Sequence, residues 1–142
     1  PGKGKPGTMI RTPVSSIDFF PTILDICGIK YNNESIDGIS LMPLFEKDDM
    51  PERPLFWHYP HYSNQGVEPG SAVRLGRYKL IDNFERERLE LYDLESDISE
   101  KYDISDANPE KTKELYKLLD EWRKANNARI MLHNPNWKGK SE

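Results

Sequence analysis

The sequence predicts an α+β fold in which a four-stranded antiparallel sheet is covered on one side by a C-terminal helix. Between residues 55 and 94, four short runs rich in β-branched and aromatic residues are joined by polar links. After residue 108, apolar residues recur at the spacing of one helical face. A chain of 142 residues is long enough to build a core from these elements.

The composition excludes several classes of protein. The chain is 36% hydrophobic and 31% charged, its net charge is −4, and its mean hydropathy is −0.79. Acidic and basic residues are interspersed along the chain and do not form blocks. We therefore expect no nucleic-acid partner, which would need a clustered basic excess. The apolar runs are too short to cross a bilayer, so we expect no membrane-spanning segment. Cys27 is the single cysteine; it lies in an apolar run and is predicted to be a buried small hydrophobe.

The first 30 residues predict a loop followed by one helix. Glycine and proline break residues 1–12, and the helix is predicted over residues 16–28. Pro21 suits its first turn, Asp18 or the preceding serines can cap it, and Gly28 ends it. Its predicted apolar stripe consists of Phe20, Ile23, Leu24 and Cys27. This stripe needs a partner surface.

Residues 30–53 are predicted to be mostly irregular. Asp37-Gly38 indicates a turn, and Leu41, Leu44 and Phe45 are predicted to dock as a short apolar turn. A charged loop follows and ends near residue 54.

Four strands are then predicted over residues 55–59, 71–76, 78–84 and 89–94, with a tight turn at Gly76 and a long loop over residues 60–70. Asn108, Pro109 and Glu110 predict a helix start with a cap, a preset φ and an acid near the positive helix end. The predicted helix face that covers the sheet consists of Leu115, Leu118, Leu119 and Trp122. Residues after 125 are predicted to be a loop or tail.

The stretch LFWHYPHYSN at residues 55–64 holds two of the three histidines. A metal site is not expected there, because no cysteine or acidic cluster completes a tetrahedral set around His58 and His61. The chain shows no signature of an activated nucleophile, so an enzyme complete within these residues is not expected. Ligand binding by His58, His61 and nearby aromatic residues is one interpretation, and an aromatic core with satisfied histidines is the other. Arg74 and Lys79, on neighbouring predicted strands, could meet an anion.

The order of motifs resembles the C-terminal part of the type I, arylsulfatase-like sulfatases of the alkaline-phosphatase superfamily. PGKGKPGT is similar to W-P-G-x-x-x-P-G-T, and TPVSSIDFFPTILDICGI to V-S-x-x-D-x-x-P-T-x-L-x-x-x-G-I. IDGISLMPLF, RPLFWHYPHY, SAVRLGRYKLI, ELYDLESDISEKYDIS and ANPEKTKELYKLLDEW follow in the family's order over residues 1–125. Two departures lie in one turn: Ile98 stands where proline is usual, and Tyr102-Asp103-Ile104 replaces an Asn-Leu pair.

The resemblance implies that the chain is the C-terminal region of a sulfuric ester hydrolase, inactive alone. Residues 1–48 would be the end of the α/β catalytic domain, residues 54–125 the C-terminal subdomain and residues 126–142 a tail. The catalytic formylglycine and the calcium ligands of the family would lie upstream, so the resemblance assigns no catalytic or metal-binding residue here. It implies that the C-terminal subdomain lies over the substrate pocket, and His58, His61 and Arg74 are the predicted rim residues.

The expected partners are the upstream α/β domain and a sulfated carbohydrate, and the longer protein is expected to be exported to the periplasm or the cell exterior. The chain on its own is expected to self-associate through its helical stripe. Two other functions stay open: a non-catalytic carbohydrate-binding or structural module, and part of a related phosphatase or phosphodiesterase.

Overall fold

The computed structural model describes residues 4, 6–46, 50–64, 66, 68–132 and 136. The chain forms two compact units, Pro1–Leu55 and Phe56–Glu142, and each is described by itself. The predicted limits 48 and 54 fall near this division, while the assignment of each part to a domain of a longer protein stays a prediction. Part of the PGKGKPGT match, part of the predicted charged loop and most of the predicted tail lie outside the described residues.

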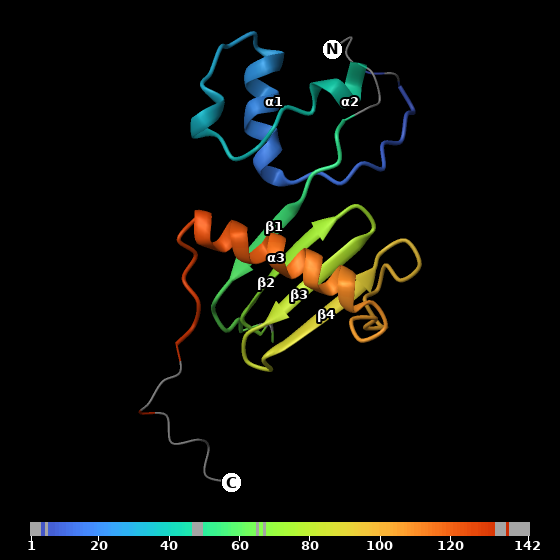
Figure 1. Ribbon diagram of the computed structural model, residues 1–142. Helices are drawn as coiled ribbons and strands as arrows, with labels where there is room; N and C mark the ends of the chain where they lie inside the picture. Colours follow the sequence, from blue (N-terminus) through green and yellow to red (C-terminus); the bar gives the residue numbers. More distant parts are fainter. Residues whose placement is uncertain are drawn as a thin grey trace. The chain divides into compact units, whose positions relative to one another are not determined.

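The helices described in the first unit are all short (Figure 1). The 3₁₀ helix η1 (Ser16–Asp18) leads directly into α1 (Phe19–Ile26), and η2 (Asn33–Ser35) and α2 (Met42–Glu46) follow. Gly28 ends α1 as predicted: its φ is 68°, and the bonds Gly28 N–H to Asp25 and Ile29 N–H to Leu24 form a Schellman motif. The prediction that Cys27 is buried is wrong for this chain, because the cysteine is exposed.

A fully buried carboxylate, that of Asp18, ties the segments of the first unit together. It accepts the backbone N–H of Ser15 at 2.8 Å and that of Ile39 at 3.0 Å, and it pairs with the Arg53 guanidinium. The Thr22 hydroxyl donates to the Asp18 carbonyl at 2.6 Å and accepts the Leu41 N–H at 2.9 Å. Asp18 occupies the N-cap position of α1, but the predicted capping is wrong for that helix, because its side chain makes no capping bond there and joins other segments instead.

Gly38 lets residues 36–41 pass directly over the 3₁₀ helix. A Cβ atom at this position would lie 2.1 Å from the carbonyl oxygen of Ile17 and 2.9 Å from the backbone nitrogen of Asp18. Neither backbone atom can move away without breaking the contacts of Asp18, so only glycine fits. The predicted Asp37-Gly38 turn is explained by this close approach.

The second unit is a four-stranded antiparallel sheet with the order β1-β2-β3-β4 (Figure 1). The strands are β1 (Leu55–Tyr59), β2 (Gly70–Leu75), β3 (Tyr78–Asn83) and β4 (Arg88–Asp93). In the central hairpin Val73 lies opposite Leu80, and Leu80 lies opposite Leu91. All four predicted strands are present, within one residue of their predicted bounds.

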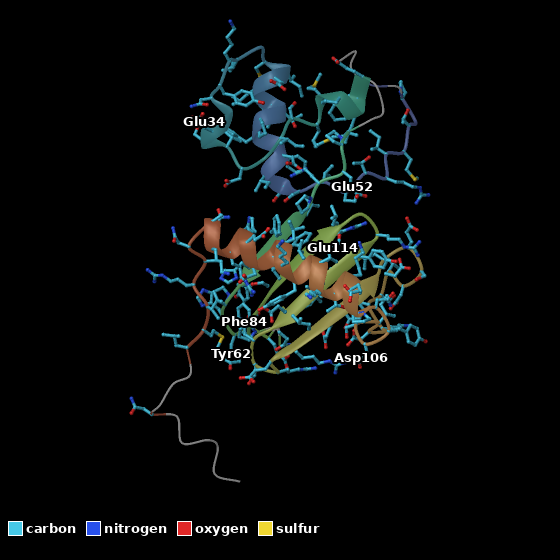
Figure 2. The ribbon with its side chains drawn as sticks, viewed as in Figure 1. Glu34, Glu52, Tyr62, Phe84, Asp106 and Glu114 are labelled. Carbon is cyan, nitrogen blue, oxygen red and sulfur yellow. The ribbon has the colours of Figure 1, made fainter. Side chains whose placement is uncertain are left out.

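Helix α3 (Pro109–Ala125) lies across one face of this sheet, as Figure 1 shows in orange. Leu115 and Leu119 are fully buried with Val73, Leu80 and Leu91, and Leu118 and Trp122 pack around this cluster. The opposite side of the helix is charged: the exposed Glu114, labelled in Figure 2, accepts from Lys111 Nζ at 2.6 Å. The predicted apolar face is therefore confirmed.

A buried ion pair fixes α3 over β3. Arg123, only 4% exposed, donates from Nη1 to Asp82 Oδ2 at 2.6 Å. Its guanidinium also lies 5.9 Å from the ring centre of Phe84 and 5.5 Å from that of Tyr116.

The helix start differs in one detail from the prediction. Pro109 is in the first turn as expected, but the Asn108 side chain makes no capping bond and donates to the Ile104 carbonyl at 3.0 Å. No helix in the described part of the chain is long and apolar enough to cross a membrane.

Candidate ligand-binding face

The face of the sheet opposite α3 carries Arg74, one of the predicted rim residues, together with other polar and aromatic side chains. Strand side chains alternate between faces, and Val73 and Leu80 point toward α3. Arg74 and Lys79, directly opposite each other on β2 and β3, therefore lie on the other face. On β1, Phe56 stacks on Trp122 of α3, so Trp57 points to the face that α3 leaves open.

Aromatic groups on this open face are accessible to a ligand. Trp57 is 46% exposed and Tyr59 is 48% exposed. The ring of His61 meets Tyr59 edge to face, with centres 5.6 Å apart and planes at 85°. The alternative in which Trp57 and Tyr59 belong to the core of this chain does not fit these exposures.

Of Arg74 and Lys79, the lysine is already paired with a carboxylate. Its Nζ donates to both carboxylate oxygens of Glu100, at 2.7 and 2.9 Å. Glu100 adopts a left-handed backbone conformation with φ 53°, which is uncommon for a residue with a side chain. The predicted anion-binding role of Lys79 is therefore weakened, and no sequence pattern indicates a partner 21 residues away.

Arg74 keeps most of its guanidinium available. Its Nε donates to the carbonyl of Gly76 at 3.1 Å, which orients the planar group. Within the part of the chain that the structure describes, no carboxylate pairs with it. A guanidinium held by its Nε can still present its two terminal nitrogens to an anion as a fork.

A neutral phenol lies beside the cations. Tyr92, 8% exposed and opposite Lys79 on β4, donates from its hydroxyl to Glu90 at 3.2 Å. Burial, followed by the negative charge of Glu90, raises the pKa of Tyr92 to about 12. The tyrosine therefore stays protonated at neutral pH and acts only as a donor or packing group.

His58 does not share this face. Its Nδ1 lies 2.7 Å from Ser71 Oγ and its Nε2 lies 2.8 Å from the carbonyl oxygen of Arg129. Its ring packs at an angle against Phe84 and Trp122, with centres 5.9 and 6.5 Å apart. The structure therefore separates His58 from Arg74, on opposite faces of the sheet, and its role as a substrate contact stays a prediction.

A second polar cluster lies where the loop after β1 meets the β3–β4 turn, at the end marked by Tyr62 and Phe84 in Figure 2. Glu68 accepts from Asn83 Nδ2 at 2.5 Å and from Arg86 at 2.8 Å. The hydrogen bond from Arg86, followed by that from Asn83, lowers the pKa of Glu68. These groups satisfy one another, so the cluster supports the loop rather than offering free groups to a ligand.

A metal site is built from several ligating side chains that lie close together. None of the described residues forms a group of three or more histidine, cysteine or acidic side chains that could hold a metal ion. The open face instead combines aromatic surfaces with one oriented guanidinium, an arrangement suited to an anionic sugar.

Comparison with known proteins identifies the family. Residues 1–127 match the family described as N-sulphoglucosamine sulphohydrolase, C-terminal. The chain belongs to this family. It is thus the C-terminal region of a sulfatase of the alkaline-phosphatase superfamily, as the resemblance implied.

The individual relatives are longer proteins. A sulfatase of Formosa agariphila is 32% identical over 123 residues, which cover 77% of this chain and 22% of the relative. Arylsulfatase K of Xenopus laevis is 32% identical over 124 residues, covering 80% and 23%. The solved structure of BT4656 in complex with its substrate D-glucosamine-2-N,6-O-disulfate is 30% identical with a TM-score of 0.66, covering 78% and 24%. The chain therefore spans less than a quarter of the length of these relatives.

Proposed function

We propose that the longer protein to which this chain belongs hydrolyses sulfate esters on carbohydrates. The observation that carries the proposal is the family match over residues 1–127. The substrate class is supported by the similar BT4656, whose substrate is a disulfated glucosamine. The aromatic rings and the free guanidinium of the open face are chemically compatible with such a ligand.

Within that protein, we propose that Arg74 and His61 contribute to the rim of the substrate pocket. Arg74 would bind a sulfate oxygen pair through its terminal nitrogens, and His61 would contact the sugar or attract its negative charge. Trp57 and Tyr59 would supply apolar surface for the sugar ring. His58, whose ring nitrogens are both engaged within the chain, would contribute only indirectly.

In this proposal the catalytic groups are supplied by the sequence upstream of the chain. The family's formylglycine and calcium ion would be supplied there, and the described residues of this chain do not fit a calcium site. We therefore derive no step through either group. Export of the longer protein is likewise a proposal, which fractionation of the producing cells tests.

The apolar surface of α1 has a place in the same proposal. Phe19, Phe20, Ile23 and Ile26 are each more than half exposed. The upstream α/β domain would cover them in the complete protein, and the chain on its own would cover them by self-association.

The test uses the complete protein, matured in a host that makes formylglycine, and measures sulfate release from a 6-sulfated glucosamine and from a small aryl sulfate. Arg74→Gln is expected to lower kcat/KM for the sugar roughly 10- to 100-fold, the range for losing a charged hydrogen bond. His61→Ala should also affect the sugar more than the aryl ester. Arg77→Gln is the matched control, because Arg77 already pairs with Asp93 and Glu95.

Equal losses on both substrates would contradict the rim assignment. Sugar binding without any sulfate release would favour a carbohydrate-binding module, and release of phosphate from esters in place of sulfate would favour the phosphatase alternative.

A further inference from the structure

The imidazole of His58 is bonded at both nitrogens within the chain. Its Nε2 faces a carbonyl oxygen, that of Arg129, at 2.8 Å. Because a carbonyl oxygen only accepts, Nε2 must carry the proton, and in the neutral ring Nδ1 then accepts from the Ser71 hydroxyl at 2.7 Å. Ser71 is 2% exposed, so this hydroxyl has little access to water as a substitute partner.

The Arg129 carbonyl reaches His58 because of how α3 ends. Asn127 has a φ of 49°, and the backbone bonds Ala128 N–H to Arg123 at 2.9 Å and Asn127 N–H to Lys124 at 3.2 Å form a Schellman motif. The chain is thereby turned out of the helix immediately before Arg129. Asparagine tolerates this left-handed conformation better than most residues, so the turn has a local sequence cause.

Aromatic side chains fix the orientation of the imidazole. The ring of His58 meets those of Phe84 and Trp122 at 57° and 64°. Phe56, two residues earlier on β1, stacks on Trp122 with ring centres 4.8 Å apart. The two nitrogens are thus held toward Ser71 and Arg129 by packing.

We propose that His58 is a positioning residue, which together with Ser71 and the Arg129 carbonyl forms a clasp that fastens the segment after α3 to the edge of the sheet. Among the described strands β1 lies at the edge of the sheet, next to β2, so the clasp adds an attachment beyond the pairing with β2. The same strand carries Trp57 and Tyr59 on its other face, so the clasp also steadies the candidate ligand-binding face. The clasp itself does not depend on the proposed function.

The test is limited trypsin digestion of the complete protein, with cleavage after Arg129 followed by mass spectrometry. His58→Phe keeps an aromatic ring but loses both nitrogens, and it should speed this cleavage roughly fivefold, the factor that one neutral hydrogen bond contributes. His58→Gln, whose amide can still donate to the carbonyl, should restore most of the protection. His61→Phe is the matched control and should leave the rate unchanged.

The rate of cleavage after Lys117, in the middle of α3, separates local release from unfolding. Release of the segment after α3 leaves the rate at Lys117 unchanged, whereas unfolding of the helix raises it. An unchanged rate after Arg129 in His58→Phe would overturn the proposal. A ¹⁵N spectrum of the wild-type histidines gives an independent decision, since the clasp requires a proton on Nε2 of His58, the nitrogen that donates to the Arg129 carbonyl. A proton on Nδ1 alone would overturn it even if the variant unfolds.

Discussion

The two units of this chain are stabilised by different kinds of interaction. In Phe56–Glu142, apolar side chains of a sheet and a helix bury one another, and five of them are fully inaccessible. In Pro1–Leu55, the best-buried large side chains include a charged one, Asp18, while the apolar residues of α1 are exposed. The second unit contains a fully buried apolar core, whereas the first is organised around the Asp18 carboxylate and leaves much of the apolar surface of α1 exposed.

This difference also explains the positions of the family-like motifs. In the first unit the matching residues Asp18, Thr22 and Gly38 hold three backbone segments together. In the second unit the matching residues Leu80 and Leu91 belong to the core. The family-like residues of the first unit therefore make polar contacts between backbone segments, whereas those of the second unit pack in the apolar core.

The largest difference between the two units is expected when one apolar side chain is truncated in each. Leu115→Ala, in the fully buried cluster, should lower the free energy of unfolding by about 2–5 kcal/mol through lost burial and a cavity. Ile23→Ala, at a side chain that is 57% exposed, should change it by no more than about 0.5 kcal/mol. Urea unfolding of the 142-residue chain, at a concentration low enough to keep it monomeric, measures both, and equal losses would show that α1 is covered within the single chain.

The exposed surface of α1 predicts self-association of the chain on its own. Replacing Phe20 and Ile23 by serine should weaken this association at least about tenfold, since burying one such side chain contributes about 1.5–3 kcal/mol. Light scattering over a concentration series measures the effect, and Ile98→Ser, at an exposed residue of the second unit, is the control. A wild-type chain that stays monomeric and binds no hydrophobic dye would contradict the prediction.

A smaller effect on stability is expected at Asp103 in the second unit, whose side chain connects β4 to the following turn. Partial burial raises the pKa of Asp103, but the N–H groups of Leu91 and Ser105 and the Arg88 guanidinium outweigh burial and lower it to about 2. Because the folded pKa lies below the unfolded value of about 3.9, the contribution to stability is present above that pH and is lost as the pH falls toward 2.

Asp103→Asn should therefore cost about 1 kcal/mol at pH 7, after allowance for solvent screening, and the difference from wild type should shrink between pH 4 and pH 2. Urea midpoints at several pH values measure it. Asp106→Asn, at the exposed residue labelled in Figure 2, should show no such convergence. A difference that stays constant across this range would refute the electrostatic explanation.

The candidate site could be predicted only in part. The alternation of residues 71–75 and 78–83 was enough to place Arg74 and Lys79 on neighbouring strands. The pairing of Lys79 with Glu100 could not be foreseen, because it needs a left-handed residue in a loop 21 positions away. The separation of His58 from Arg74 likewise depends on which face α3 covers.

By itself the sequence determined the elements of this protein and their family. Short runs rich in β-branched and aromatic residues marked the four strands, and the spacing of Leu115, Leu119 and Trp122 marked α3. The order of motifs indicated a sulfatase C-terminal region. These signals are local or ordered along the chain. Only the tertiary structure decided which polar groups are already satisfied. Apart from the local bond from Ser15, the partners described above for the Asp18, His58 and Lys79 side chains lie 13 to 71 residues away, and no local pattern encodes contacts across such separations.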